Sequence, residues 1–467
     1  MHARYKMVTA WLMGWLISAS LAALAGGTSL SLHGGPVPRL REIHHERLHV
    51  PIQSDQAVDL APGSDLAAIA TLNEVRVWRL DTNQVIKVFA FGKQRAAVRK
   101  EMGTAEPLHV GFSPNGTTLA ISYMSRIYLY DVATWRQVGS LGVEGEDTPR
   151  RPAVPTDEPI RRPTLSGSPF PTAQDRQELR RYKREMDERY DRTKKAGDGR
   201  TRVAGFTFTP DGAKLLAGYA RGECFVWFHW GEPSLWPSGN DPVRLWEVNT
   251  GRVLWERVYD PETVMRGFLL SPNGKWFAAQ ACGDHGNHYV VVHELQTGQR
   301  LYSLPMALGA SAVIFTPNSQ QLITNPSDEM GCLATVRLHL DHPDDPWRQQ
   351  LTPADEACQK LGGRQCDSLA LYDVATGKQV GKLTDDETTF AAGLSPDGRW
   401  LAAGQWSNRY TFRIWDMQTH RPVGRYTPSG WAWLSGTADL LRFQPNGRRL
   451  VVVNTAKGLL AVYEVVP

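Results

Sequence analysis

A short segment centred on a proline recurs seven times in this chain of 467 residues. Each copy places one apolar stretch before the proline and a second one a few residues after it; the prolines are Pro62, Pro114, Pro210, Pro272, Pro317, Pro396 and Pro445. Proline pre-sets φ at the start of a turn, and the glycine present in every copy but the one at Pro317 supplies the positive φ that closes a tight hairpin. Repetition with a period of roughly 40–50 residues indicates units that stack or form a ring.

Each copy contains four short strand-like stretches, which predicts an all-β fold: a seven-bladed β-propeller. The stretch after the turn at Pro396 reads W-L-A-A-G, and the third stretch ends in an aromatic-acidic pair such as Trp415-Asp416. The last copy contains only three stretches before the sequence ends. We therefore expect Arg47–Gln53, which alternates as R-L-H-V-P-I-Q, to complete the seventh blade and remove an exposed sheet edge.

The phrase S-P-D-G-R-W-L-A-A-G, followed by R-I-W-D-M-Q-T, resembles the WD-repeat (WD40-like) family, and the resemblance covers about residues 47–467. It implies a propeller that binds proteins or peptides. Two family features are missing: the Gly-His dipeptide and a regular Asp before the third strand. The resemblance therefore does not carry over the buried Ser/Thr-His-Asp-Trp network. The stretch Leu245–Glu256 is similar to a repeat of quinoprotein-type propellers.

The N-terminus has the parts of an export signal. Basic residues precede an apolar run over 7–25, which ends in A-L-A followed by two glycines. The run is also near the lower length limit of a membrane-spanning helix, so a cleaved signal and an uncleaved anchor both remain open. Either way, we expect an extracytoplasmic protein, periplasmic or secreted, with residues 1–25 as signal or anchor, 26–46 as linker and 47–467 as propeller. The net charge of +4 is too small to favour a nucleic-acid partner.

Four insertions interrupt the repeat, over 91–108, 142–203, 220–242 and 325–367. In a four-stranded meander, the loops between strands two and three and the links between blades lie at one end of the ring. All four insertions fall at that end, which marks it as a binding face. The alternative is drift, since long surface insertions cost little stability.

The insertion over 142–203 combines a proline-rich part with a segment, 174–195, that is dense in both charges. This segment predicts one α-helix, because acid-first pairs recur at i,i+4 and four apolar residues form a narrow stripe. The stripe is a candidate partner-binding surface, or it packs on the propeller itself; its members are Leu179, Tyr182, Met186 and Tyr190.

Tryptophans gather in the expected loops at the same end of the ring. Exposed indoles there would suit a peptide or sugar, whereas packed indoles would hold the loops down. The first group is Trp227, Trp230 and Trp236, and the second is Trp406, Trp431 and Trp433. Outside the cytoplasm disulfides persist, so Cys358 and Cys366 are a candidate disulfide, and the odd total of five cysteines leaves at least one without an intrachain partner.

Two patterns suggest metal binding and both are weak. His45-Glu46-Arg47-Leu48-His49 has the letters of a zinc-protease motif, but Pro51 follows closely and a strand fits these residues as well as a helix. Cys282, His285 and His288, with Asp284, lie close together but match no strong zinc spacing.

We therefore predict a non-enzymatic scaffold without a cofactor or catalytic or metal-binding residues. Its partner would be a protein or peptide bound at the inserted end, with no nucleic acid and with a possible membrane tether through 7–25. Two alternatives remain: a secreted propeller enzyme or cofactor protein that uses the mouth of the central channel, and an envelope or outer-membrane assembly factor.

Overall fold

A computed structural model describes most of the strands and turns of the chain. The described residues are 38–47, 56–71, 74–91, 108–143, 202–220, 242–259, 264–282, 288–306, 312–325, 369–383, 389–405, 412–429, 438–455 and 457–466. Within these ranges the fold is all β, and no helix occurs, so none there is long and apolar enough to span a membrane. The helix predicted over 174–195 and the apolar run over 7–25 lie outside the described residues.

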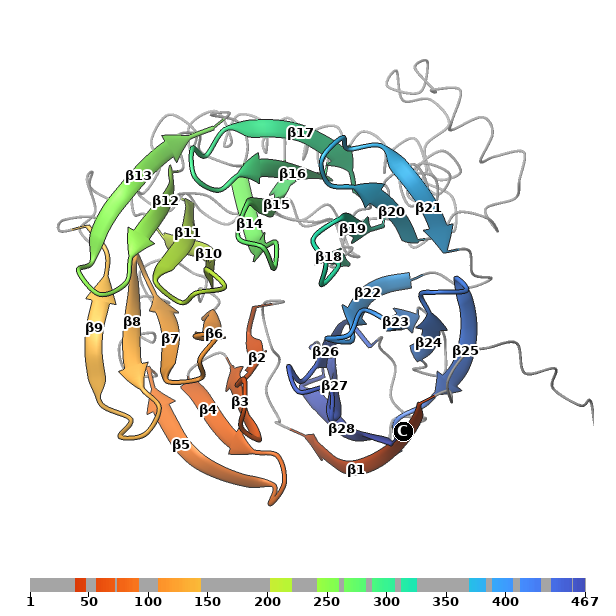
Figure 1. The fold of residues 1–467 in the computed structure, drawn as a ribbon. Coiled ribbons are helices and arrows are strands. Elements are labelled where there is room, and N and C mark those ends of the chain that lie inside the picture. The colour runs from red at the N-terminus through yellow and green to blue at the C-terminus, as the bar shows by residue number, and fades with distance from the viewer. Residues whose placement is uncertain are drawn as a thin grey trace, which may run out of the picture. The chain divides into compact units, whose positions relative to one another are not determined.

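The described strands form seven antiparallel four-stranded sheets, which confirms the expected seven-bladed propeller. The first strand of each blade surrounds the axis and the fourth lies outermost (Figure 1). Blades 1 to 4 comprise β2 (Val58–Leu60), β3 (Leu66–Ala70), β4 (Glu74–Arg79), β5 (Gln84–Ala90); β6 (Val110–Phe112), β7 (Thr118–Tyr123), β8 (Arg126–Asp131), β9 (Gln137–Leu141); β10 (Arg202–Phe208), β11 (Lys214–Ala220), β12 (Pro242–Glu247), β13 (Arg252–Val258); and β14 (Val264–Leu270), β15 (Trp276–Cys282), β16 (His288–Glu294), β17 (Arg300–Pro305). Blades 5 to 7 comprise β18 (Val313–Phe315), β19 (Gln321–Thr324), β20 (Leu369–Asp373), β21 (Gln379–Leu383); β22 (Thr389–Leu394), β23 (Trp400–Gln405), β24 (Phe412–Asp416), β25 (Arg421–Tyr426); and β26 (Leu440–Phe443), β27 (Arg449–Asn454), β28 (Leu459–Val466), with β1 (Arg39–Arg47) as the fourth strand.

The strand beside β28 is therefore β1, and it pairs antiparallel from Arg39 opposite Val466 to Arg47 opposite Leu459. The segment that we predicted for this place, Arg47–Gln53, shares only Arg47 with β1, and its other residues lie outside the described part of the chain. β1 instead occupies residues that we expected to be a linker.

First strands of neighbouring blades contact each other all around the axis, including β26 with β2. Small residues make this approach possible. A Cβ on Gly393 of β22 would lie 2.5 Å from the carbonyl oxygen of Leu441 in the next blade, and one on Gly404 of β23 would lie 1.9 Å from that of Ala438. The packing between blades therefore requires glycine at these positions.

In blades 2 to 6, the turn after the first strand is held by its own side chains. In the turn at Pro114, the Ser113 hydroxyl donates to Asn115 Oδ1 (2.6 Å) and accepts from the Thr118 N–H (2.9 Å). Thr209, Ser271, Thr316 and Ser395 play the same part in their blades. In blade 7 the residue is Gln444, whose side-chain amide donates to the Ser64 carbonyl (2.6 Å) and so joins blade 7 to blade 1.

A β-bulge recurs where the third strand meets the fourth. In six blades the register skips one residue of the fourth strand, and the skipped residue is always aliphatic: Ile86, Val138, Leu254, Leu301, Val380 or Val423. β1 has the same skip at Ile43, between Glu42 and His44. β1 thus has its bulge at the same position as the fourth strands of the other six blades.

The buried tryptophans do not form the network typical of WD repeats. Trp78, Trp246 and Trp415 lie at equivalent positions near the ends of third strands, and each buries its indole N–H without a hydrogen-bond partner. Their contribution is therefore packing in the apolar cores between blades.

Substituting Gly404 with alanine tests the packing between blades. We expect Gly404→Ala to lower the free energy of unfolding by about 1–3 kcal/mol, since the new methyl group meets a backbone carbonyl. Urea unfolding followed by tryptophan fluorescence measures the change. Gly139→Ala is the matched control, because its Cβ would meet only Leu129 at an ordinary 3.6 Å. Equal stability of both variants would contradict this account.

Candidate functional site

The side chains singled out from the sequence as a binding face all lie outside the described residues, so those assignments stay predictions. They are Leu179, Tyr182, Met186, Tyr190, Trp227, Trp230, Trp236, Trp406, Trp431 and Trp433, together with the cysteine pair Cys358 and Cys366. Cys282 and His288 pair across the ends of β15 and β16, and the residues between them lie outside the described part. Within the described ranges, no group of three or more His, Cys, Asp or Glu residues is arranged to hold a metal ion.

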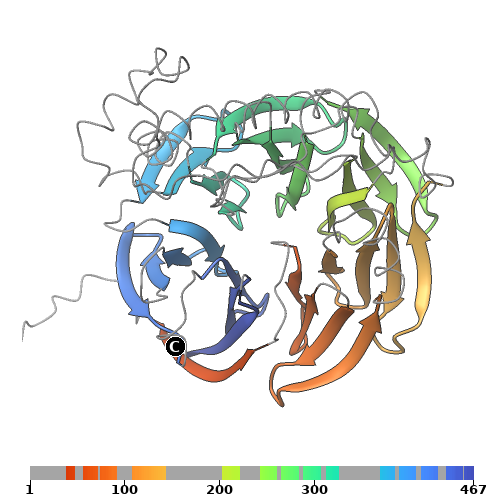
Figure 2. The same ribbon diagram turned by 180° about the vertical axis from the view of Figure 1, so that it is seen from behind.

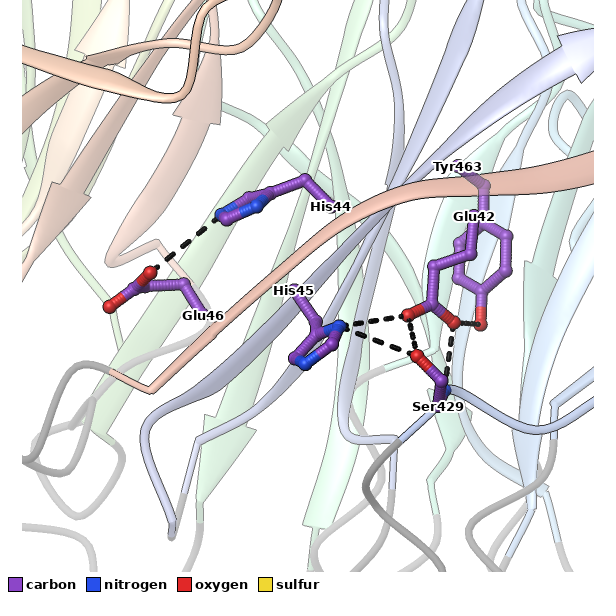
Figure 3. Close-up of polar contacts among 6 residues, drawn as sticks. All are labelled: Glu42, His44, His45, Glu46, Ser429 and Tyr463. Atoms are coloured by element: carbon purple, nitrogen blue, oxygen red, sulfur yellow. Dashed lines mark hydrogen bonds and ion pairs between the residues drawn. The ribbon is translucent and has the colours of Figure 1, made fainter.

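A cluster of polar side chains lies along β1 (Figure 3). The bulge at Ile43 changes which residues share a face, so that Glu42 and His45 point to one side and His44 and Glu46 to the other. The first three residues of the sequence motif that begins at His45 are therefore in an extended strand, where His45 and Glu46 diverge, and its last two residues lie outside the described part. A helical metal-binding pair needs the opposite geometry.

Glu42 is the centre of the first side of the cluster. Its carboxylate accepts hydrogen bonds from the Ser429 N–H (2.8 Å), the Ser429 hydroxyl and the Tyr463 hydroxyl (3.2 Å), and it faces His45 Nδ1 at 3.2 Å. Ser429 follows β25, so these bonds attach β1 to the link that leaves blade 6. The Glu42 side chain is only 18% exposed. Losing any of these hydrogen bonds would therefore leave a largely buried polar group without a partner, which lowers the stability of the fold.

An aromatic cluster packs around Tyr463, the residue that donates its hydroxyl hydrogen bond to Glu42. Tyr463 packs edge-on against Phe412, with ring centroids 5.3 Å apart, and Phe412 stacks with Tyr426 at 5.4 Å. Burial and the nearby charge of Glu42 raise the pKa of Tyr463. The phenol therefore stays protonated and donates to the carboxylate.

The group of Ser429, His45 and Glu42 is not arranged for nucleophilic catalysis. In a catalytic triad the imidazole bridges the carboxylate and the hydroxyl through its two different nitrogens. Here His45 Nδ1 faces both groups, and the Ser429 hydroxyl donates its proton to Glu42. The cluster is therefore a junction that holds β1, with no proton relay.

The second side of β1 faces blade 1. His44 Nε2 lies 3.8 Å from Glu46 Oε2, and the His44 side chain is hydrogen-bonded with that of Asn83, in the turn between β4 and β5. Burial lowers the pKa of His44. Trp255 and Tyr302 follow the bulge at the same position in blades 3 and 4, and they donate to backbone carbonyls of the next blade. His44 thus occupies, in blade 7, the position from which Trp255 and Tyr302 hydrogen-bond to the next blade.

The axis of the ring contains a second polar group, Gln56. Its backbone carbonyl accepts from Val110 of blade 2, and its side chain bonds both Phe206 of blade 3 and Phe268 of blade 4 at 3.0–3.2 Å. Gly205 allows this, since a Cβ there would lie 2.6 Å from Gln56 Oε1. The side chain of this one residue therefore links two other blades, and its backbone carbonyl links a third.

Asp59 lies three residues after Gln56, in the inner strand β2. Its carboxylate accepts from the Phe112 N–H at 2.6 Å. Burial raises its pKa to about 6, although that hydrogen bond and the charge of Arg442 act in the opposite direction. Asp59 is a buried ionisable group, but among the described residues the charged side chain that acts on its pKa is Arg442, and no second carboxylate does so as a pair for acid–base catalysis would.

His293 replaces the aromatic residue of the third strand in blade 4. It is fully buried, stacks on Phe277 with ring centroids 4.6 Å apart, and contacts Tyr259 at 4.4 Å. Its Nδ1 lies 3.3 Å from the Gly298 carbonyl. Burial lowers the pKa of His293 to about 4, so the ring is neutral near pH 7.

The junction at Glu42 makes a testable contribution to stability. We expect Glu42→Ala to cost about 1–3 kcal/mol, because it leaves Tyr463 and the Ser429 N–H without their acceptor. Arg41→Ala is the control, since the Arg41–Glu464 pair is exposed and such pairs contribute at most about 1 kcal/mol. Urea midpoints measure both, and a larger loss for Arg41→Ala would contradict the assignment.

His293 predicts sensitivity to acid. Below its ordinary pKa of 6.5 the unfolded chain binds a proton that the folded chain excludes, so stability falls as the pH drops from 6.5 to about 4. At about 1.4 kcal/mol per pKa unit, the loss approaches about 3 kcal/mol. His293→Phe should remove this part of the pH dependence. Unfolding free energies of both proteins between pH 4 and 7.5 test it, and parallel curves would disprove it.

The fold was compared with known proteins. No family model matches the chain. Among solved structures, the chain is similar to the β-propeller domain of Cps50 (Swd1) from Myceliophteria thermophila, with a TM-score of 0.52 and 11% sequence identity, over 91% of this chain and 100% of that domain. Identity this low supports the fold alone. Together with the seven described sheets, it identifies the fold of the chain as a seven-bladed β-propeller.

Proposed function

We propose that this protein is an extracytoplasmic scaffold that binds a protein or peptide through one end of its propeller. A β-propeller of this kind is typically a platform for protein interactions, and the chain offers one end that differs from the other. We call the end that carries the turns between strands one and two, and three and four, the turn face. The opposite end, which carries the loops between strands two and three and the links between blades, is the insertion face.

The strand bounds carry the proposal. On the turn face, five residues separate the first and second strands in every blade, and four or five separate the third and fourth wherever both belong to one continuous hairpin. On the insertion face, the connections include 91–109, 142–201, 221–241 and 325–368. Chain length is thus added at one end only, as expected for a binding face built on a rigid ring.

The proposal that the protein is exported rests on the N-terminal pattern, in which basic residues precede an apolar run over 7–25. The run supports both a cleaved signal and a retained anchor. A scaffold outside the cytoplasm accounts for either form.

An enzyme that uses the axis as its site is less well supported. Gln56 fills space at the axis and bonds to blades 3 and 4, and its bonds are structural rather than directed toward an open site. Among the described residues, no carboxylate acts on the pKa of Asp59, whereas acid–base catalysis commonly uses a pair of such groups.

Replacing residues 144–201 by a short Gly-Ser linker tests the proposal. The described strands end before and start after this segment, so the ring should fold and keep its circular-dichroism spectrum and cooperative unfolding. Capture of the partner by photo-crosslinking in native envelopes, followed by mass spectrometry, should fall at least tenfold. Arg136→Glu with Lys378→Glu, on the turn face, is the control and should keep full capture. A folded deletion variant that still captures the same partner would overturn the proposal for this insertion.

A further inference from the structure

Three of the hairpin turns on the turn face contain an Asn-Gly pair, and these are the only such pairs in the sequence: Asn115-Gly116, Asn273-Gly274 and Asn446-Gly447. All three asparagines are exposed, and the three glycines have a positive φ of 67° to 72°. Asparagine before glycine reacts readily with its own backbone, because glycine has no side chain to hinder the approach of the backbone nitrogen. Each of these turns therefore contains the two groups that a self-modification of the chain requires.

This modification is deamidation, and its only co-reactant is water. At the pair in blade 7, the Gly447 backbone nitrogen attacks the side-chain carbonyl carbon of Asn446 and forms a new C–N bond. The bond from that carbon to the side-chain nitrogen breaks, and ammonia leaves with the proton of the backbone N–H. Water then opens the resulting succinimide ring at one of its two carbonyl carbons, which gives aspartate or isoaspartate.

The folded turn blocks the attack in the same way at all three pairs. Gly116, Gly274 and Gly447 each donate the backbone N–H to the carbonyl oxygen three residues earlier, at 2.8 Å. This hydrogen bond must break before the nitrogen can reach the side chain. The rate in the folded protein therefore depends on how often each turn opens locally, and a turn with fewer hydrogen bonds opens more often.

Two of the three turns have a serine hydroxyl that holds them closed. Ser113 and Ser271 donate to the side-chain oxygen of the asparagine in their own turn, at 2.6 and 2.8 Å. Each hydroxyl also accepts from the backbone N–H that begins the second strand, at 2.9 Å. The Asn273 N–H donates in addition to the Ser319 hydroxyl of blade 5 (2.9 Å). Opening either turn therefore breaks several side-chain hydrogen bonds.

The turn in blade 7 lacks this hydroxyl, because Gln444 stands at the serine position. The Gln444 side chain bonds to blade 1 instead and makes no hydrogen bond within its own turn. Among the described residues, the side-chain oxygen of Asn446 accepts from the Arg448 N–H alone (2.9 Å). Asn446 is therefore held by fewer hydrogen bonds than the asparagines of the other two pairs.

We propose that Asn446 is the asparagine of the three that deamidates first, and that its conversion to isoaspartate loosens blade 7. Aspartate itself fits the turn, since Asp211 and Asp397 occupy the same position in blades 3 and 6 and accept equivalent hydrogen bonds. Isoaspartate instead adds a carbon atom to the main chain between β26 and β27, where Phe443 pairs with Leu450. This hairpin belongs to the blade in which β1 and β28 close the ring.

Peptide mapping by mass spectrometry tests the order of the three sites. The full chain is incubated in mildly alkaline buffer, and the aspartyl and isoaspartyl peptides are separated and counted at each site. We expect Asn446 to react at least threefold faster than Asn115 and Asn273, and all three to react at similar rates in urea, where the turns are absent. Equal rates in the folded protein would overturn the proposal. The same excess at Asn446 in urea would also overturn it, because the local sequence and not the turn would then set the order.

Removing the hydroxyl from a matched turn tests the cause. Ser271→Ala deletes the hydrogen bond to the side-chain oxygen of Asn273, so the rate at Asn273 should rise at least threefold. Asn115 is the internal control, and its rate should stay unchanged in this variant. An unchanged rate at Asn273, or an equal rise at both asparagines, would contradict a local role of the serine hydroxyl.

Urea unfolding tests the effect on the ring. Protein that has accumulated isoaspartate at position 446 should unfold at a lower urea concentration than fresh protein. Asn446→Asp should have the midpoint of fresh protein and should lose much less stability over the same incubation. An isoaspartate-containing fraction with an unchanged midpoint would overturn the proposed loosening of blade 7.

Discussion

The close approach of the seven innermost strands is the constraint on which this structure depends. Each first strand must contact its two neighbours around the axis, and β26 must contact β2 to complete the circle. This leaves no room for side chains at several positions, so Gly205, Gly393 and Gly404 face backbone or side-chain atoms of other blades at distances that exclude a Cβ. Gln56 uses one of these gaps to join blades that are not adjacent.

The outer edge follows a different rule. A fourth strand must bend around its blade, and the recurring bulge provides the bend by leaving one aliphatic residue out of the register. β1 has the same bulge, although it is far from β28 in the sequence. Its bulge places Glu42 and His45 on one side and His44 on the other, and thereby gives the strand contacts with both neighbouring blades (Figures 2 and 3).

The number of blades and the turn positions were predictable because the turn chemistry is local. Ser113 and Asn115 lie within one hairpin, and five of the seven blades have the same contacts. The outer strand of blade 7 was placed incorrectly because alternation alone favoured Arg47–Gln53. A better signal was present: R-E-I-H at Arg41 matches R-Q-V-G at Arg136, with the aliphatic residue at the bulge. The junction of Glu42 with Ser429 could not be predicted, since it joins residues 387 apart that no repeat relates.

The two ends of the ring differ because only one of them is needed to close the hairpins. On the turn face, Asp or Asn residues such as Asp211 and Asn273 accept hydrogen bonds from their own turns, so an insertion there would remove bonds that hold two strands together. On the insertion face the strands have already ended, and added residues disturb no repeated contact. Function at the insertion face can therefore change without loss of the fold, while the turn face keeps the same compact turns.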